Sequence, residues 1–455
     1  MKIVIIGNGS LGDTLIEYIS REGHNITVVD EDRDAVTAVV NKYDVMGVCG
    51  SGASVETQRE AGVETADVVI SVAGGDELNL LCCVIAKQLG AKHTIARVRD
   101  PRYLNQQSFM QSGLGIDVII NPEYEAAREA GRIIRFPAAM KLEKFAQGKA
   151  EALEIHIGKN HPFIDQPLIK FKSKYSTNVL ICAAKRGDNV IIPGGDYVIR
   201  EGDTISVAGS RPDITDLFVK TGLVGKQLHD IVIIGGDGSS TYLAKQLTDS
   251  GYKVKIIEQD RETCEELSEL IPKATIICGD PTDPDVLDEE GIEKADACVV
   301  MTANDQRNFI ISMFAQTRNV KKIISRLSSA KFVRLASNAG IDSNITPGIL
   351  VASKVLRYIR GLVGMEDHEN AGQLKSLHKL VDGRVEALEF DVAEDFSALN
   401  IPLREVKLKK NLIIAALIRE NSVTYPGGET RLMPGDSVIV MTTNENLCDL
   451  DDILL

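Results

Sequence analysis

KIVIIGNGSLG, residues 2–12, joins a run of β-branched residues directly to three spaced glycines. A strand that passes through GxGxxG into a helix is the arrangement of a dinucleotide-binding turn. Gly7 allows the tight turn, Gly9 lets a pyrophosphate approach the backbone, and Gly12 lets helix and strand pack closely. The first N–H groups of the helix then face the phosphates. The alternative is a glycine turn kept for packing alone.

Ligands of open α/β sheets lie across the C-terminal ends of the strands, so residues that follow each apolar run are candidate contacts. Asp30 ends the run NITVVD, eighteen residues beyond Gly12. A carboxylate there accepts the adenosine ribose hydroxyls and repels a 2′-phosphate, so NAD(H) is favoured over NADP(H). Small residues at the next two strand ends leave room for adenine or ribose, namely Ser51 within Gly50-Ser51-Gly52 and the pair Ala73-Gly74.

Charged residues near the other strand ends have less specific signals. Arg97 ends the run HTIAR, and we expect it either to reach a phosphate or a partner subunit or to be a solvated basic side chain. Asp76 and Glu77 are expected to form a solvated helix cap without a metal role. The histidines lack metal-ligand spacing and the cysteines form no CxxC pair. We therefore predict no metal site and no catalytic residue, and we expect the cysteines to be reduced core residues.

Apolar runs alternate with helical stretches through the first 120 residues. KIVII, NITVVD, DVMGV, ADVVISV and HTIARV are predicted as five strands, with amphipathic segments between them. This alternation predicts an α/β fold, a parallel Rossmann-like sheet with helices on both faces. The next part differs, because ALEIHI, NVLICAAKR, NVIIP and DTISVAG are strands separated by Pro, Gly and Asp turns. That pattern predicts a small α+β lobe.

The whole arrangement occurs twice in the chain. Gly7 recurs as Gly235 and Asp30 recurs as Glu258, both 228 residues later, and the small lobe also repeats. A proline opens the helical segment that connects the two lobes of each half. We predict six segments: a Rossmann-like lobe at 1–120, a connecting helix at 121–137, an α+β lobe at 138–222, a second Rossmann-like lobe at 229–345, a second connecting helix at 346–365 and a second α+β lobe at 366–455.

The second copy departs from the dinucleotide fingerprint. GGDGSS, residues 235–240, keeps the first glycine but has Asp237 at the second glycine position and Ser240 at the third. An aspartate beside a pyrophosphate costs Coulomb energy, and a side chain at the third position pushes the helix outward. We expect this lobe to hold a differently posed adenosine ligand or none.

Composition excludes several partners. The 455-residue chain has a net charge of -14 and no tryptophan. Nucleic acids and anionic lipid surfaces need a basic face, so neither is an expected partner. No apolar run reaches the roughly 18 residues of a membrane helix, and the first residues show no signal-peptide pattern. We therefore expect a cytoplasmic protein without direct membrane insertion.

These motifs together resemble the TrkA family of Trk potassium-uptake proteins, which are built from tandem regulator-of-conductance-of-potassium (RCK) domains with TrkA-N and TrkA-C lobes. The resemblance covers essentially the whole chain and rests on GNGSLG with VVD, then GSGAS, VAGGDELN, TIARVR and NPEYEAA. It implies NAD(H), with ATP or ADP as further ligands. The implied contacts in the first lobe are Gly7, Asn8, Gly9, Ser10, Leu11, Asp30, Ala73, Gly74 and Arg97. The weaker contacts implied in the second lobe are Gly235, Gly236, Asp237, Gly238, Ser239 and Glu258.

The resemblance also implies a regulatory subunit that gates a Trk-type potassium-translocating membrane subunit from the cytoplasmic face of the membrane. Such domains form a ring, for which a homotetramer is expected and a dimer is the alternative. The competing function is an NAD-dependent oxidoreductase, which needs an acid or base beside the nicotinamide. Neither small lobe offers such a group at recognisable spacing, so we do not expect an enzyme.

Overall fold

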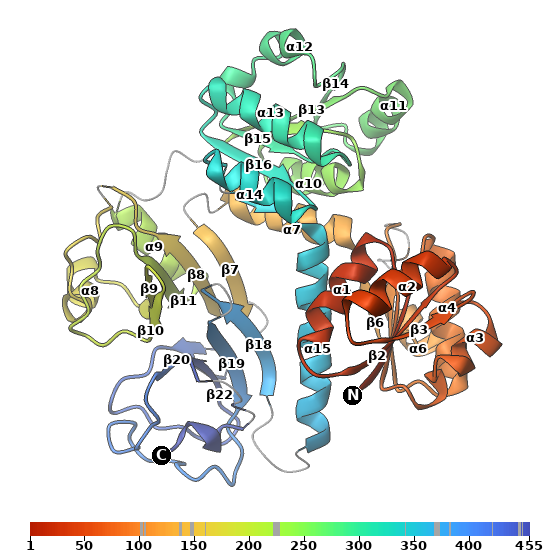
Figure 1. The fold of residues 1–455 in the computed structure, drawn as a ribbon. Helices are drawn as coiled ribbons and strands as arrows, with labels where there is room; N and C mark the ends of the chain where they lie inside the picture. The colour runs from red at the N-terminus through yellow and green to blue at the C-terminus, as the bar shows by residue number, and fades with distance from the viewer. Residues whose placement is uncertain are drawn as a thin grey trace. The chain divides into compact units, whose positions relative to one another are not determined.

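The computed structural model describes residues 1–100, 103, 106–135, 139–145, 150–159, 161–221, 228–341, 343–367, 374–381, 384–420, 422–444, 447 and 449–455. The chain forms two compact units (Figure 1). The first comprises Met1–Ile134 with Leu228–Leu356, and the second comprises Arg135–Gln227 with Arg357–Leu455. Each unit therefore contains one part from each half of the duplicated chain.

The first unit contains two Rossmann-like lobes. The elements of the first lobe are β1 (Lys2–Ile6), α1 (Ser10–Ser20), β2 (Asn25–Asp30), α2 (Arg33–Lys42), β3 (Met46–Cys49), α3 (Val55–Glu60), η1 (Val63–Thr65), β4 (Val68–Ser71), α4 (Asp76–Leu89), β5 (His93–Arg97), α6 (Gln107–Leu114), β6 (Val118–Ile120) and α7 (Pro122–Arg135). Those of the second lobe are β12 (Asp230–Ile234), α10 (Gly238–Asp249), β13 (Lys253–Glu258), α11 (Arg261–Leu270), β14 (Thr275–Cys278), α12 (Pro284–Glu289), η3 (Ile292–Lys294), β15 (Ala297–Val300), α13 (Asp305–Thr317), β16 (Lys322–Arg326), α14 (Ala330–Asn338), β17 (Ser343–Ile345) and α15 (Pro347–Asp367).

Both lobes have the same parallel topology, which confirms the predicted fold class. The strand orders are β3-β2-β1-β4-β5-β6 and β14-β13-β12-β15-β16-β17. The chain reverses direction across the sheet between β1 and β4, and a crevice forms at the carboxyl ends of the strands at such a point. Six strands occur in each sheet rather than the five predicted, because β6 and β17 are only three residues long. A run of that length shows no readable alternation.

Helix α7 leaves the first lobe and completes the core of the second. Five buried residues of α7 share that core with residues of β12 and β13. The five are Ala126, Ala127, Ala130, Ile133 and Ile134. Helix α15 starts beside α1 of the first lobe (Figure 1), where a Cβ on Gly348 would lie 3.3 Å from Thr14 Oγ1. Lys354 of α15 also pairs with the buried Glu125 of α7 at 2.7 Å. The second lobe therefore depends on a helix from the first half of the chain.

The second unit packs two antiparallel sheets of five strands each, in the orders β10-β9-β11-β8-β7 and β18-β19-β22-β20-β21. Small buried residues such as Ala183 and Ala387 let the two sheets share one core. The predicted pattern missed β7, β18 and the helices α8 and α9. The elements are β7 (Ala139–Phe145), β8 (Ala150–His156), α8 (Leu168–Tyr175), β9 (Leu180–Arg186), β10 (Asn189–Ile191), β11 (Thr204–Gly209), α9 (Arg211–Thr221), β18 (Leu374–Leu380), β19 (Val385–Asp391), β20 (Leu412–Arg419), β21 (Ser422–Thr424), β22 (Ser437–Thr442) and η4 (Asp451–Ile453).

Asp296 is expected to make the first unit sensitive to acid. Lys321 Nζ lies 2.5 Å from its carboxylate and the N–H groups of His229 and Asp230 donate to it, which lowers the pKa of Asp296 to about 2. An unfolded aspartate has a pKa near 3.9, so the folded carboxylate contributes roughly 1–2 kcal/mol. This contribution is complete above about pH 5 and is lost as the pH falls toward 2. Urea unfolding of the wild type and Asp296→Asn should therefore differ at pH 7 and converge near pH 2. A gap that stays constant over this range would contradict the assignment.

Candidate functional site

The three glycines after β1 have three different structural roles. Gly7 has a φ of +100°, and a Cβ there would lie 2.7 Å from the backbone nitrogen of Ala73. A Cβ on Gly12 would lie 2.1 Å from the carbonyl oxygen of Gly7, so both positions require glycine. A Cβ on Gly9 would instead meet no atom within 4 Å. Gly9 is also the N-cap of α1 and supplies no side-chain acceptor, so the first N–H groups of this helix face open space.

Asp30 is held in place by the glycine loop. Its Oδ2 accepts a hydrogen bond from the backbone N–H of Asn8 at 2.6 Å, and its Oδ1 accepts one from the N–H of Asp32 at 2.9 Å. A carboxylate has about four lone-pair sites, so two remain for ligand hydroxyls. Glu258 repeats this arrangement in the second lobe, accepting from the N–H groups of Gly236 at 2.7 Å and Asp260 at 2.8 Å. The acidic residue therefore also fixes the loop, a role that the sequence pattern did not predict.

Arg97 is buried, with 7% of its surface exposed, which excludes the solvated alternative. Its Nη2 donates to the carbonyl oxygen of Ala73, and its Nε is buried without a hydrogen-bond partner in the described part of the chain. Burial and the nearby Arg99 lower the pKa of Arg97. A guanidinium that is desolvated and lacks a full set of partners favours an anion beside it.

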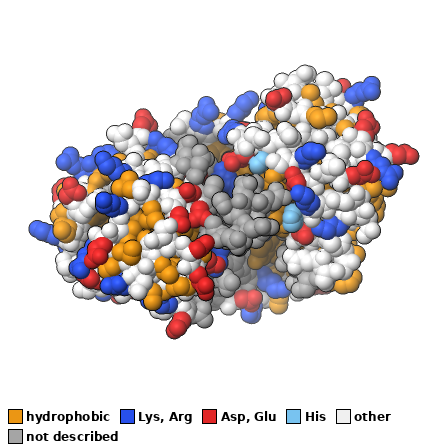
Figure 2. Space-filling model, turned by 90° about the horizontal axis from the view of Figure 1, so that it is seen from below, with side chains coloured by type: hydrophobic (Ala, Val, Ile, Leu, Met, Phe, Trp, Pro, Cys, Tyr) orange, Lys and Arg blue, Asp and Glu red, His pale blue; other side chains and the backbone are white. Residues whose placement is uncertain are grey.

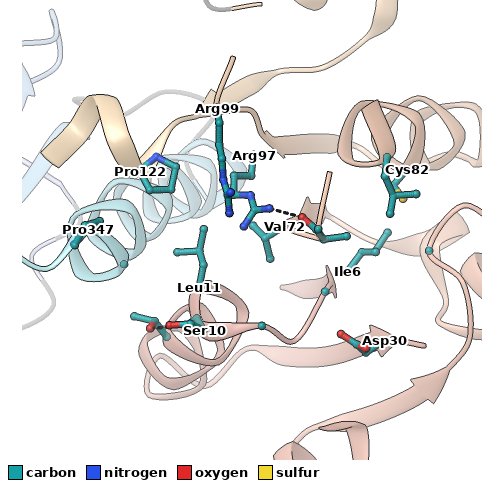
Figure 3. Close-up of a pocket in the computed structure, with 18 of the residues that line it drawn as sticks. Ile6, Ser10, Leu11, Asp30, Val72, Cys82, Arg97, Arg99, Pro122 and Pro347 are labelled. Atoms are coloured by element: carbon teal, nitrogen blue, oxygen red, sulfur yellow. Dashed lines mark hydrogen bonds between the residues drawn. The ribbon is translucent and has the colours of Figure 1, made fainter. Parts of the chain in front are cut away.

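A cavity of about 510 Å³ brings these groups together, a volume typical of small-molecule sites. In Figure 3, Arg97 and Arg99 approach it from the side opposite to Asp30. The predicted residues that line the cavity are Gly7, Gly9, Ser10, Leu11, Asp30, Ala73, Gly74 and Arg97. Asn8, Gly12 and Ser51 are not among the lining residues; Gly50 and Gly52 line the cavity beside Ser51. Asn8 instead donates its side-chain amide to the carbonyl oxygen of Ala35 at 2.9 Å.

The cavity has a second wall that the sequence pattern did not predict. Residues from β16 onward and from the start of α15 form it, namely Arg326, Ser328, Thr346, Pro347 and Gly348. These residues are distant in sequence from the glycine loop and reach it because the two lobes pack together. The available signal was the repeat itself, since Arg326 is the counterpart of Arg97. The first-lobe lining residues that the pattern missed include Thr14, Cys82, Arg99 and Glu123.

A buried asparagine joins the strand ends behind the cavity. Asn79 Oδ1 accepts a hydrogen bond from Ser71 Oγ at 3.0 Å, and Asn79 Nδ2 donates to the carbonyl oxygens of Ala73 at 3.2 Å and Arg97 at 3.0 Å. Asp76 is not the expected helix cap, because Gly75 is the N-cap of α4. The Asp76 carboxylate instead accepts the N–H groups of the loop after β5. A repeated D-x-x-N pattern, at 76–79 and 305–308, was the signal for this support.

The second-lobe candidates do not line this cavity, although Asp237 pairs with Arg326, which does. Gly235 has a φ of +100°, as Gly7 has, but none of Gly235, Gly236, Asp237, Gly238, Ser239 and Glu258 lines the cavity. Asp237 is the N-cap of α10, and its side chain accepts a hydrogen bond from the N–H of Ser240 at 3.1 Å. The Ser240 side chain is buried at the third glycine position. The second glycine loop is therefore folded like the first but carries its own carboxylate.

Other features of the described residues bear on the remaining expectations. None of the described helices is long and apolar enough to cross a membrane. No group of three or more His, Cys, Asp or Glu side chains in the described ranges is placed to hold a metal ion. Figure 2 shows charged side chains of both signs interspersed on the face drawn. Cys49 and Cys278 are exposed, so the expectation that the cysteines lie in the core was wrong for these two.

Comparison with known families matches the TrkA-N domain at residues 3–122 and 231–347 and the TrkA-C domain at residues 152–222 and 387–455. The chain is 30% identical over 454 residues to the Trk system potassium uptake protein TrkA homolog of Archaeoglobus fulgidus, with 100% of each chain covered. The solved GsuK RCK domain is similar over 98% of this chain and 92% of that chain, with a TM-score of 0.64 and 18% identity. The GsuK channel bound to NAD is similar over 98% of this chain and 77% of that chain, with the same TM-score and identity.

Proposed function

The chain belongs to the TrkA family of potassium uptake proteins, and from this premise we propose that it is a regulatory subunit whose first Rossmann-like lobe binds NAD(H) and so controls a Trk-type potassium-translocating membrane subunit. The cavity of the first lobe carries the proposal, because a helix N-terminus without a side-chain cap faces the buried Arg97, and Asp30 is fixed opposite. A dinucleotide requires these groups for its pyrophosphate and ribose. The GsuK channel, which has a similar fold, has been solved bound to NAD.

The cavity supports a sensor rather than an oxidoreductase. Its lining, within the described residues, includes no histidine, lysine or tyrosine, and among its carboxylates Asp30 accepts backbone hydrogen bonds and Glu123 pairs with Arg99. The Asp30 carboxylate already accepts two backbone hydrogen bonds. Its remaining negative charge disfavours a 2′-phosphate, which supports NAD(H) over NADP(H), with ATP and ADP as shorter competitors for the same glycine loop.

Control of a partner requires two states that bind the ligand with different affinity. The cavity offers a basis for this difference, because its walls come from both lobes, with Gly9 and Ser10 on one side and Pro347 and Gly348 on the other. A dinucleotide and a mononucleotide fill this space differently. We propose that the lobes assemble into a homotetrameric ring at the cytoplasmic face of the membrane subunit and that nucleotide length sets the spacing of the lobes.

Asp30→Ala should weaken NADH binding by about 1–3 kcal/mol, because the ribose hydroxyls lose a charged acceptor. The measurement is calorimetric titration of the full chain. The substitution also removes a partner of the Asn8 N–H, so thermal unfolding should accompany it. Asp32→Ala is the matched control, because Asp32 caps α2 two residues away and does not line the cavity. Equal NADH affinity in wild type and Asp30→Ala would contradict the assignment of Asp30 as a ligand contact.

The regulatory step is tested by reconstituting the ring with a co-encoded Trk membrane subunit. Potassium flux is measured with ATP, ADP, NAD and NADH in turn, for wild type and Asp30→Ala. We expect flux through the wild-type complex to depend on which nucleotide is present and the dependence on NADH to be lost in Asp30→Ala. Flux that is the same with every nucleotide, in a complex that binds NADH, would contradict the regulatory proposal.

A further inference from the structure

Asp237 has the backbone conformation of Gly9 but adds a side chain. Its φ and ψ are -69° and 176°, and those of Gly9 are -71° and -174°. In the first lobe, a Cβ on Gly9 would extend into open space, and Gly9 lines the cavity. The Asp237 side chain therefore extends in the direction that the first lobe leaves open for a ligand.

The Asp237 carboxylate makes the two contacts that a phosphate makes at a helix N-terminus beside an arginine. Its Oδ1 accepts the N–H of Ser240 in the first turn of α10 at 3.1 Å, and its Oδ2 pairs with Nη1 of Arg326. The same Nη1 lies 3.4 Å from Ser239 Oγ. Arg326 is the counterpart of Arg97, whose Nε lacks a partner in the described part of the chain. The duplicated lobes thus contain equivalent arginines: Arg326 pairs with the aspartate of its own glycine loop, whereas Gly9 in the first loop offers Arg97 no such carboxylate.

A second carboxylate group lies near the start of α10. The Cγ atom of Glu123 lies 3.6 Å from the position that a Cβ on Gly238 would take. In the second half of the chain, the residue after the proline that opens the connecting helix is Gly348, and it lies beside Thr14 of α1. Glu123 also lines the first-lobe cavity, where it pairs with Arg99 at 3.4 Å, so the carboxylate that distinguishes the second glycine loop from the first is that of Asp237.

We infer that Asp237 occupies the place of a nucleotide phosphate in the second lobe, so that each chain binds a single nucleotide, in its first lobe. This inference rests on the proposed function of the first lobe as a nucleotide site. The second glycine loop and Arg326 keep their anion-bound arrangement whether or not nucleotide is present. The second lobe is then a constant partner, and only the first lobe responds to the nucleotide.

Calorimetric stoichiometry of the full chain with NADH, and separately with ADP, tests this inference. We expect one nucleotide per wild-type chain and two per Asp237→Gly chain, because the glycine removes the carboxylate and releases Arg326. Asp237→Ser is the second variant, since it keeps a capping oxygen for α10 without the charge. Thermal unfolding shows which variant is folded. In the Asp237→Gly background, Asp30→Ala should remove the first-lobe site and leave the second-lobe site. Glu258→Ala should remove the second-lobe site and leave the first-lobe site.

Two results would overturn the inference: two nucleotides per wild-type chain, or one nucleotide per chain in a folded Asp237→Gly or Asp237→Ser variant. Failure of the proposed first-lobe site gives a different result. In that case the wild type binds no nucleotide, and any site gained by Asp237→Gly is insensitive to Asp30→Ala. The stoichiometry of the wild type therefore separates the two failures.

Discussion

Gly12→Ala is expected to lower the free energy of unfolding of the first unit by about 3 kcal/mol or more and to abolish NADH binding. The new Cβ would lie 2.1 Å from the carbonyl oxygen of Gly7, and this neighbour is backbone that cannot rotate away. Helix α1 must then move off β1, which opens the buried contacts of Leu15 and Ile16. Overpacking typically costs 1–3 kcal/mol, and a backbone clash of this size lies at the upper end or beyond. Urea unfolding and NADH titration measure the two effects.

Gly9→Ala is the matched control in the same loop. Its Cβ meets no atom within 4 Å and Gly9 already has a φ of -71°, so alanine fits without strain. We expect a stability change within about 0.5 kcal/mol. Its methyl group enters the space that the pyrophosphate needs, so NADH affinity should fall. If Gly9→Ala loses as much stability as Gly12→Ala and binds NADH with wild-type affinity, the glycine loop is a packing element alone.

Arg97→Met is expected to weaken NADH binding by about 1.5–3 kcal/mol without lowering the stability of the ligand-free protein. A charged hydrogen bond to a ligand phosphate contributes about that amount. The ligand-free protein, in contrast, buries a guanidinium whose Nε lacks a partner in the described part of the chain. A buried charge that lacks a full set of partners costs desolvation free energy, and an apolar side chain of similar length avoids that cost. Arg97→Met should therefore weaken NADH binding while the stability of the ligand-free protein stays the same or rises. Calorimetry measures the NADH affinity, and thermal unfolding measures the stability.

Arg59→Met controls for the loss of one positive charge from the first lobe. Arg59 pairs with Glu64 on the exposed surface and does not line the cavity. We expect this variant to match the wild type in affinity and, within about 0.5 kcal/mol, in stability. If Arg97→Met destabilises the free protein and leaves NADH affinity intact, Arg97 is a structural residue and the phosphate position lies elsewhere.

The periodic part of the fold was predictable from the sequence because its signal is local. The glycine loop and the strand ends can each be recognised in a short run of residues, and the duplication repeats those runs. Together they predicted the Rossmann-like fold class. Short elements such as β6 gave no periodic signal. Burial along the edge strand β3 was misjudged for Cys49, because alternate residues of a strand point to opposite faces and Val48 takes the buried one. An apolar neighbourhood in sequence therefore did not imply burial.

The predicted contacts Gly9 and Asp30 line the cavity, but its second wall was not predictable. Pro347 and Gly348 reach it only through the packing of one lobe against the other, which no local pattern encodes. The different partners of Arg97 and Arg326 could not be predicted from local sequence either. Arg97 and Arg326 occupy equivalent positions, and their difference depends on whether an aspartate or a glycine stands across the loop. The sequence predicted an altered second loop at Asp237 but not that this aspartate pairs with Arg326.

The transfer of α7 to the second lobe has a consequence for the order in which the protein is synthesised. The apolar face formed by Ala126, Ala130 and Ile133 leaves the ribosome before β12 and β13, the strands that it covers, have been made. A nascent chain, or one truncated before the second lobe, therefore exposes this face to aggregation or to chaperones. Joining the two halves in one polypeptide shortens the time for which this face is exposed. The connecting chain keeps α7 and the second-lobe sheet at a high effective concentration. Splitting the halves into separate chains would make the core of the second lobe depend on a bimolecular encounter.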